Sequence, residues 1–161
     1  MTVDVILEDD RWSDLDRLAA VAVPAALDGA GVGTGWEVAV MGCDDARIAA
    51  LNADFRGKAR PTNVLSWPSD ERGADTPGGP PLAPDPHDPE LGDIAIAYDT
   101  CAREAAEQNK PFDAHVIHLL VHATLHLLGY DHQTEADAMR MESLEVRIVT
   151  ALGLPDPYAT P

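Results

Sequence analysis

Alternating apolar and polar residues mark the segments of this chain that are expected to form β-strands. A period of two places successive side chains on opposite faces, so that one face can be buried. In the last of these segments, Ile94, Ile96 and Tyr98 fall on one face and two alanines fall on the other. The pattern predicts four strands, over residues 3–8, 36–41, 64–67 and 91–98.

Apolar residues recur every three or four positions in much of the remaining chain, which predicts amphipathic helices. Asp44 and Thr134 stand where N-caps are needed. Pro24 is expected to kink the first helix or to end it early. The fourth helix is apolar on most sides and should be the central, buried one. Five helices are expected, over residues 15–26, 45–55, 100–110, 111–128 and 135–152.

Residues 69–90 lack a hydrophobic period and are rich in Pro, Gly and acidic residues. Such a segment buries too little apolar surface to offset the entropy of ordering, so we predict a mobile loop. His87 lies within it and is expected to be exposed to solvent. Nothing else divides the chain, and its 161 residues, 45% of them hydrophobic, are expected to form a single domain.

The cysteines and the lengths of the apolar runs indicate the cellular compartment in which the protein is expected. Cys43 and Cys101 have no C-x-x-C partner, and we interpret both as small buried residues of a protein from a reducing compartment. No segment reaches the run of about 18 apolar residues that would span a bilayer, and the N-terminus has no basic region. We therefore expect a cytoplasmic protein with no membrane association.

Acidic residues give the chain a formal net charge of −17 and a pI near 4.4. Affinity for nucleic acid comes mainly from Lys and Arg that displace counterions from phosphates, so binding to RNA needs a local basic patch. Arg56, Lys58 and Arg60 are the candidates for such a patch, although their composition alone favours a solvated loop. The acidic residues of the last helix are interpreted as its solvent-exposed face: Glu135, Asp137, Glu142 and Glu145.

Three histidines spaced H-x3-H-x5-H form the strongest chemical signal, in the stretch HATLHLLGYDH. On a helix, His122 and His126 are four positions apart and share one face. Gly129 is suited to end that helix and turn the chain, which would bring His132 to the same point. A lone histidine is usually a packed core residue, but three in this pattern predict a metal site. Three protein ligands leave a fourth tetrahedral position for a metal-bound water, as in catalytic zinc sites.

The same spacing occurs in the zincin motif, but Ala123 replaces the glutamate that acts there as general base, so a protease is not expected. His118 lies one turn before His122 and could be a fourth ligand, a proton carrier, a packed residue or a hydrogen-bonding partner of the site. We favour the last two roles. Asp131 and Asp93 are candidate acceptors for the ring N–H groups of the ligands, or else a turn cap and a strand-end residue.

On these motifs the chain resembles the YbeY family of bacterial rRNA maturation factors, which are metal-dependent endoribonucleases. The family pattern H-G-x-L-H-L-x-G-Y-D-H matches residues 122–132, except that Ala123 replaces a glycine. The pattern L-N-x-x-[YF]-R-G-K-x-x-P-T-[DN]-V-L-S-[FW]-P matches residues 51–68, and L-G-D-I matches residues 91–94. The three motifs occur in the family's order, and the resemblance covers most of the chain.

The resemblance implies an α+β fold, with a small mixed β-sheet of about four strands, about five helices, and a zincin-like metal helix packed against the sheet. It implies one YbeY-like domain over residues 1–161 and one Zn²⁺ per chain, bound by His122, His126 and His132. Imidazole ligands also accept nickel, copper and cobalt. Arg56 would be the basic residue of the cleft that stabilises the phosphate, and Lys58 and Arg60 would be RNA-binding residues.

The implied activity is single-strand-specific cleavage in the maturation of the 3′ end of small-subunit (16S) rRNA and in ribosome quality control. Its partners would be single-stranded rRNA and the small ribosomal subunit with its proteins, and no DNA. Either a metal-bound hydroxide or the 2′-hydroxyl of the RNA would attack, and the sequence leaves this choice open. Two alternatives remain: a noncatalytic assembly factor with a structural metal, and a metal-dependent hydrolase of a small substrate.

Overall fold

The computed structural model describes residues 2–74 and 76–158. Within these residues the chain forms four strands, five α-helices and one short 3-10 helix. The strands are β1 (Thr2–Leu7), β2 (Glu37–Cys43), β3 (Val64–Pro68) and β4 (Glu90–Ala97). The helices are η1 (Asp10–Trp12), α1 (Leu15–Gly29), α2 (Asp45–Arg56), α3 (Tyr98–Glu107), α4 (Phe112–Leu127) and α5 (Glu135–Ala151). The α+β class, the four strands and the five helices are confirmed.

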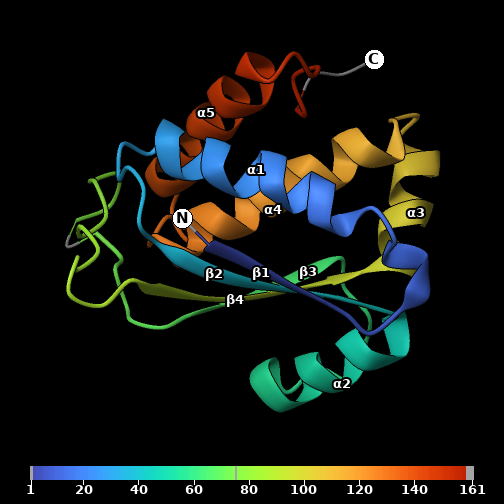
Figure 1. Ribbon diagram of the computed structural model, residues 1–161. Coiled ribbons are helices and arrows are strands. Elements are labelled where there is room, and N and C mark those ends of the chain that lie inside the picture. Colours follow the sequence, from blue (N-terminus) through green and yellow to red (C-terminus); the bar gives the residue numbers. More distant parts are fainter. Residues whose placement is uncertain (1, 75, 159–161) are drawn as a thin grey trace.

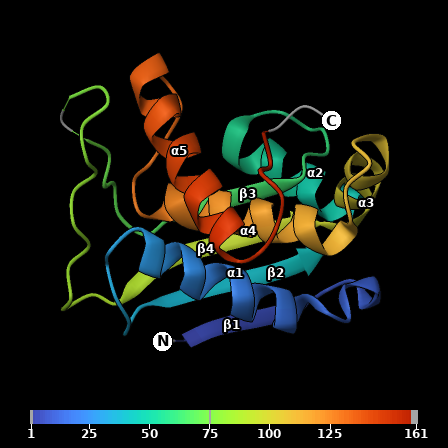
Figure 2. The ribbon, with the colours of Figure 1, turned by 90° about the horizontal axis from the view of Figure 1, so that it is seen from above.

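The four strands form one mixed sheet in the order β1-β2-β4-β3. β1 pairs with β2 and β2 with β4 in parallel, whereas β3 runs antiparallel to β4 at the edge. The helices lie on both faces of this sheet: α1 and α4 cover one face, α5 packs on these two helices, and α2 covers the other face (Figure 1). Viewed from above, α1 and α4 lie side by side over the sheet and α5 lies across α4 (Figure 2).

The main core lies between the sheet and helices α1 and α4, and it continues between these helices and α5. Ile94 and Ile96 of β4 are buried in it, whereas Ala95 and Ala97 belong to a smaller cluster under α2. The alternation expected for this strand is therefore confirmed. Cys43 also lies in the smaller cluster, where burial raises the pKa of its thiol to about 12.

Most helix boundaries lie within a few residues of those expected from the sequence. The side chains of Asp44 and Thr134 accept hydrogen bonds from the backbone N–H groups of the first turns of α2 and α5, as predicted. Pro24, however, does not end α1, which continues to Gly29. The buried face of that helix, which includes Val23 and Leu27, packs into the core and outweighs the hydrogen bond that the proline removes.

The segment between β3 and β4 has no regular secondary structure in its described residues, 69–74 and 76–89. His87 is exposed, as expected. Arg72, by contrast, is only 6% exposed and donates hydrogen bonds to the carbonyl oxygens of Leu127 (2.8 Å) and Leu91 (3.4 Å). The beginning of this segment is thus fixed against the end of α4, and the mobility of the rest stays a prediction. Among the described helices, none is both long and apolar enough to cross a membrane.

Gly92 in β4 provides a test of this packing. Its φ is +142°, and an added Cβ would overlap the carbonyl oxygen of Trp67 and lie 2.9 Å from Leu127 Cδ2. We expect Gly92→Ala to lower the free energy of unfolding by about 3 kcal/mol and Tm by about 6–12 °C. Gly33→Ala is the matched control, because Gly33 also has a positive φ but no atom within 4 Å of an added Cβ. Equal melting temperatures for the two variants would contradict the argument from close packing.

Candidate metal centre

The helix α4 presents histidines along the one side that the rest of the protein leaves open. Its other sides are buried against the sheet and against α1 and α5, through Val116, Leu120, Val121 and Leu125 among others. His118, His122 and His126 follow one another at intervals of four residues and are only partly buried. The packing that makes α4 central therefore also fixes the orientation of this row of imidazoles.

Gly129 brings the third histidine of the motif to this row. Its φ is +104°, a region that side chains with a Cβ rarely enter, and an added Cβ would overlap the carbonyl oxygen of Arg72. The chain therefore turns back after α4 and places His132 beside His122, with ring centroids 5.7 Å apart and nearly parallel planes. The close approach of Arg72 to this turn explains why a glycine is needed at position 129.

The three histidines converge as the spacing predicts. One ring nitrogen from each of His122, His126 and His132 lies within 4.8 Å of the other two. Nitrogen is a ligand that Zn²⁺ and other transition-metal ions prefer, and three such groups around one point can hold a single ion. Burial, His122, His132 and Arg56 lower the pKa of His126 to about 4, so that its imidazole is neutral and able to coordinate a cation at neutral pH.

Glu145 of α5 is the residue of this site that the sequence reasoning placed wrongly. It was interpreted as part of a solvent-exposed acidic face, yet its side chain is 0% exposed. One carboxylate oxygen, Oε1, lies 2.9 Å from His118 Nε2 and 2.9 Å from His122 Nδ1. Although Glu135 and Glu142 of the same helix are exposed as expected, Glu145 turns inward toward α4.

The Glu145 carboxylate determines which nitrogen of His122 faces the metal. Burial alone would raise the pKa of Glu145, but the hydrogen bonds from His118 and His122 outweigh it and lower the pKa to about 2. An ionised carboxylate only accepts hydrogen bonds, so the Nδ1–H of His122 donates to it. In the neutral ring the opposite nitrogen, Nε2, then carries no proton and is the one left to bind a metal together with the other two histidines.

Tyr158 completes the contacts of this carboxylate. Its hydroxyl lies 3.0 Å from each oxygen of Glu145, and its ring stands edge-on to His118 with centroids 5.4 Å apart. Burial and the neighbouring Glu145 raise the pKa of Tyr158, so the hydroxyl stays protonated and donates. His118 thus contacts the site through Glu145, which agrees with the favoured interpretation of a packed, hydrogen-bonding residue.

The histidines border a cavity of about 370 Å³. We call it the histidine cavity; besides His118, His122, His126 and His132 it is lined by residues that include Arg56, Asn63, Ser66, Ala123 and Tyr158. The C-terminus of α2 supplies Arg56, which the sequence reasoning expected in the cleft. Lys58 and Arg60 are exposed and are not among the described residues that line the cavity.

The two aspartates expected to accept hydrogen bonds from the ligands lie elsewhere. Asp93 is exposed on the α2 side of the sheet, beside Met41 and Trp67, because it alternates with Ile94, whose side chain faces α4. The sheet separates it from the histidines, so that expectation is wrong, and the acceptor for His122 is Glu145 instead.

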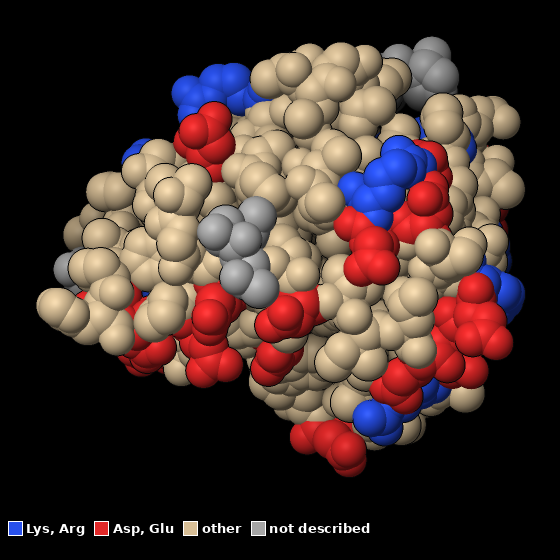
Figure 3. All heavy atoms as spheres, viewed as in Figure 1, with Lys and Arg blue, Asp and Glu red and all other residues tan. Residues whose placement is uncertain are grey.

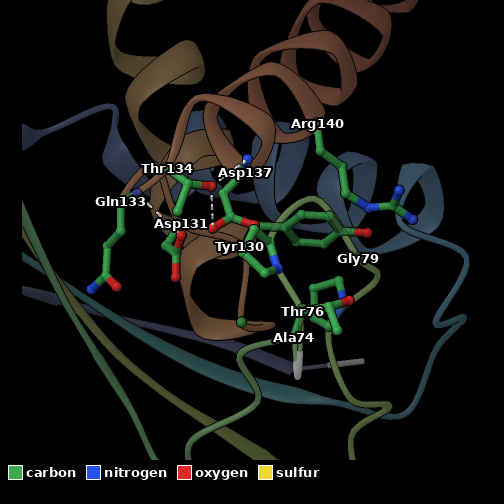
Figure 4. Close-up of a pocket in the computed structure, with 12 residues that line it drawn as sticks. Ala74, Thr76, Gly79, Tyr130, Asp131, Gln133, Thr134, Asp137 and Arg140 are labelled. Carbon is green, nitrogen blue, oxygen red and sulfur yellow. Dashed lines mark hydrogen bonds between the residues drawn. The ribbon is translucent and has the colours of Figure 1, made fainter.

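Asp131 accepts a hydrogen bond from the backbone N–H of Gln133 (3.2 Å), which is the turn-capping role that was its alternative. It borders a second hollow, of about 210 Å³, which the segment around Thr76 and Gly79 forms with the start of α5 (Figure 4). The remaining histidine of α4, His115, is buried and bound to Glu104 (3.0 Å), and it does not belong to the metal group.

Comparison with known proteins identifies the family. The sequence model described as "Endoribonuclease YbeY" matches residues 7–153. The chain belongs to the YbeY endoribonuclease family. A relative named Endoribonuclease YbeY from Dinoroseobacter shibae is 57% identical, over 99% of this chain and 92% of its own length. Another of that name, from Ruegeria pomeroyi, is 56% identical over 98% of both chains.

A solved structure supports the fold of this YbeY-family chain independently of its sequence. The solution structure of TM1509 from Thermotoga maritima superposes with a TM-score of 0.57, covers 98% of this chain and 99% of its own, and is 20% identical. At that identity the similarity shows the shared fold. Family membership makes the chain an endoribonuclease, and its three histidines can bind a metal ion.

We expect Glu145→Gln to weaken metal binding about 10- to 100-fold, because an amide offers the imidazoles a neutral and weaker acceptor. Competition between the protein and a chromophoric chelator for Zn²⁺ measures this change. Glu142→Gln is the matched control, since Glu142 lies on the same helix but is exposed. An unchanged affinity in Glu145→Gln would show that the carboxylate does not determine the geometry of the ligands.

Proposed function

We propose that this chain is a single-strand-specific, zinc-dependent endoribonuclease that acts in the maturation of the 3′ end of small-subunit (16S) rRNA and in ribosome quality control. One observation carries the proposal: three imidazoles with ligand atoms within 4.8 Å of one another border a cavity that also contains an arginine. Such a site combines a cation with a group that pairs with phosphate. Both are suited to the negative charge that develops when a phosphodiester is cleaved.

A bound zinc ion supplies a Lewis acid that activates water at neutral pH and stabilises negative charge on oxygen. Its ligands would be His122, His126 and His132, all of them neutral donors. Neutral ligands leave the full dipositive charge of the ion unreduced, which strengthens both effects. Three nitrogen ligands with a fourth position left open are typical of catalytic zinc sites, and the same ligands also accept nickel, copper and cobalt.

The protein's own groups bind and orient the substrate. The Arg56 guanidinium lines the cavity on the side of α2 and can pair with two phosphate oxygens at once. The residue that follows the first ligand is Ala123, so position 123 supplies no carboxylate to act as general base. We consider two nucleophiles, water and the 2′-hydroxyl of the RNA itself, and the product ends distinguish the two routes.

The acidic surface of the chain favours an RNA substrate that is bound through only a few phosphate contacts. Acidic side chains cover more of the face in Figure 3 than basic ones do, in keeping with the net charge of −17. A duplex presents two rows of phosphates to such a surface, whereas a flexible single strand can place one phosphodiester in the cavity. Lys58 and Arg60 lie two and four residues after Arg56, and we propose that they bind the neighbouring phosphates.

The match of the sequence to the YbeY motifs supports the proposed rRNA substrate and, with it, a cytoplasmic location on the small ribosomal subunit. The acidic surface also suits a second function, that of a noncatalytic assembly factor, because ribosomal proteins are basic and would be attracted to it. The two functions differ in whether the purified protein cleaves RNA.

We expect purified protein to cleave an unstructured RNA oligonucleotide, and a chelator to abolish the cleavage. Arg56→Ala should lower kcat/KM about 100-fold, since loss of one electrostatic contact to the transition state costs on the order of 3 kcal/mol. His122→Ala should remove both activity and bound metal. The readout is the rate of product formation on a denaturing gel, with the product ends identified by mass spectrometry.

Arg147→Ala is the control for the arginine variant, because Arg147 is exposed on α5 and does not line the histidine cavity. It should cleave at the wild-type rate, and Arg56→Ala should keep the wild-type Tm. Cleavage that persists in His122→Ala would reveal a contaminating ribonuclease. Binding to the small subunit without any cleavage by the wild type would favour the assembly factor. A 2′,3′-cyclic phosphate end would identify the 2′-hydroxyl as the nucleophile.

The dependence of RNA binding on salt tests the local-patch argument. With at most three phosphate contacts, from Arg56, Lys58 and Arg60, the slope of log K against log salt concentration should be no steeper than about −2. Replacing Lys58 and Arg60 together by alanine should make the slope shallower by about 1.4. Fluorescence anisotropy of a labelled RNA over a salt series measures both values. A slope of about −5 would require a basic surface that the sequence does not provide.

A further inference from the structure

The segment after α5 returns to the metal centre. The family match ends at Gly153, and the described residues beyond it pass back across α4 (Figure 2). Leu154 packs against the main core, and the Nζ of Lys110 donates a hydrogen bond to the carbonyl oxygen of Pro157 (2.9 Å). These two contacts bring Tyr158 to the wall of the histidine cavity.

Tyr158 makes a contact that the buried carboxylate of Glu145 needs. Oε1 of Glu145 accepts from His118 and His122 as well as from the tyrosine, whereas Oε2 has the Tyr158 hydroxyl as its only partner among the described residues. A buried, charged oxygen left without a donor carries a large desolvation penalty. Without the hydroxyl, the carboxylate would rotate toward another donor, and this rotation would disturb its bond to His122.

We propose that Tyr158 is a positioning residue of the metal centre: its hydroxyl holds the Glu145 carboxylate in the orientation that directs Nε2 of His122 to the shared ligand point. This inference rests on the metal-dependent function proposed above and extends it to a segment outside the family match. It assigns residues 154–158, which follow α5, a part in forming the metal site.

The exposed part of the tyrosine suggests a competing role. The residue is 43% exposed and lines the histidine cavity, so its ring could simply serve as a wall against which RNA lies. The two roles depend on different atoms. Tyr158→Phe removes the hydroxyl and keeps the ring, whereas Tyr158→Ala removes both.

The test uses full-length protein loaded with Co²⁺, whose visible absorption reports the geometry of the ligands. In Tyr158→Phe we expect a changed absorption band and release of Co²⁺ to a chelator about 10-fold faster than in the wild type. For RNA cleavage, kcat should fall by a similar factor, with KM within about twofold. Lys110→Met keeps the hydroxyl but loosens the segment that carries it, and it should show a smaller increase in the rate of release.

Tyr98→Phe is the matched control. Tyr98 packs against Trp12 and Phe112, and its hydroxyl makes no hydrogen bond within the described part of the chain, so spectrum and release should match the wild type. In a Glu145→Gln background, Tyr158→Phe should add nothing further, because both changes act through one carboxylate.

Three results would overturn the proposal. In the first, Tyr158→Phe matches the wild type in spectrum and release, and only Tyr158→Ala changes the protein, through a higher KM for RNA; Tyr158 is then a wall of the cavity. In the second, the effect of Tyr158→Phe is undiminished by Glu145→Gln. In the third, the wild type binds neither Co²⁺ nor Zn²⁺. That result would also contradict the proposed function, and a metal-binding measurement on the wild type alone distinguishes it from the other two.

Discussion

The buried carboxylate of Glu145 is the interaction on which the candidate site depends. It is 0% exposed, and a charge at such a position is tolerated only because its oxygens accept hydrogen bonds from two imidazoles and a phenol. These donors come from α4 and from the segment after α5, so one side chain joins three parts of the chain. The same bonds that satisfy the charge also orient His122, and stability and ligand geometry therefore have a common origin.

The position of α4 explains how this network stays in place. A helix buried on most sides cannot rotate about its axis without moving the core, so its row of histidines is fixed by packing far from the metal. The turn at its C-terminus is fixed separately, since Arg72 donates to the carbonyl oxygen of Leu127 and lies against Gly129. A positive guanidinium at the C-terminus of a helix is also favoured by the helix dipole. The three ligands are thus held from two sides.

Local patterns predicted the fold and the ligands well because each depends on residues close in sequence. His122, His126 and His132 lie within eleven residues, and helix periodicity together with one glycine determines their arrangement. Glu145 could not be placed in this way: its burial depends on histidines 23 and 27 positions away, and its sequence neighbourhood resembles an ordinary acidic helix face.

Two of the other differences, at Asp93 and Arg72, have distinct causes. The alternation of side chains along the strand assigned Ile94 to the core face. The same alternation places its neighbour Asp93 on the opposite face of the sheet, so the sequence contained the information needed to exclude Asp93 from the site. Arg72 gave no signal, because a segment rich in Pro, Gly and acid has no period from which burial can be inferred. Its guanidinium is buried by carbonyl groups that only the folded chain brings together. Composition and spacing therefore do not predict those site residues whose contacts are with segments distant in sequence.

A chain with a net charge of −17 can still serve a polyanionic substrate, because the relevant charge is local. At physiological ionic strength the Debye length is about 8 Å, so exposed carboxylates farther away contribute little at the phosphate to be cleaved. The described residues that line the histidine cavity include the ligand imidazoles and Arg56 but no acidic side chain, and the Glu145 carboxylate is bonded to His122 and His118. With a dipositive ion bound, the histidine cavity would be a positive region in an acidic surface. Such a surface would repel RNA wherever it approaches except at the cavity, which favours productive contact over nonspecific binding.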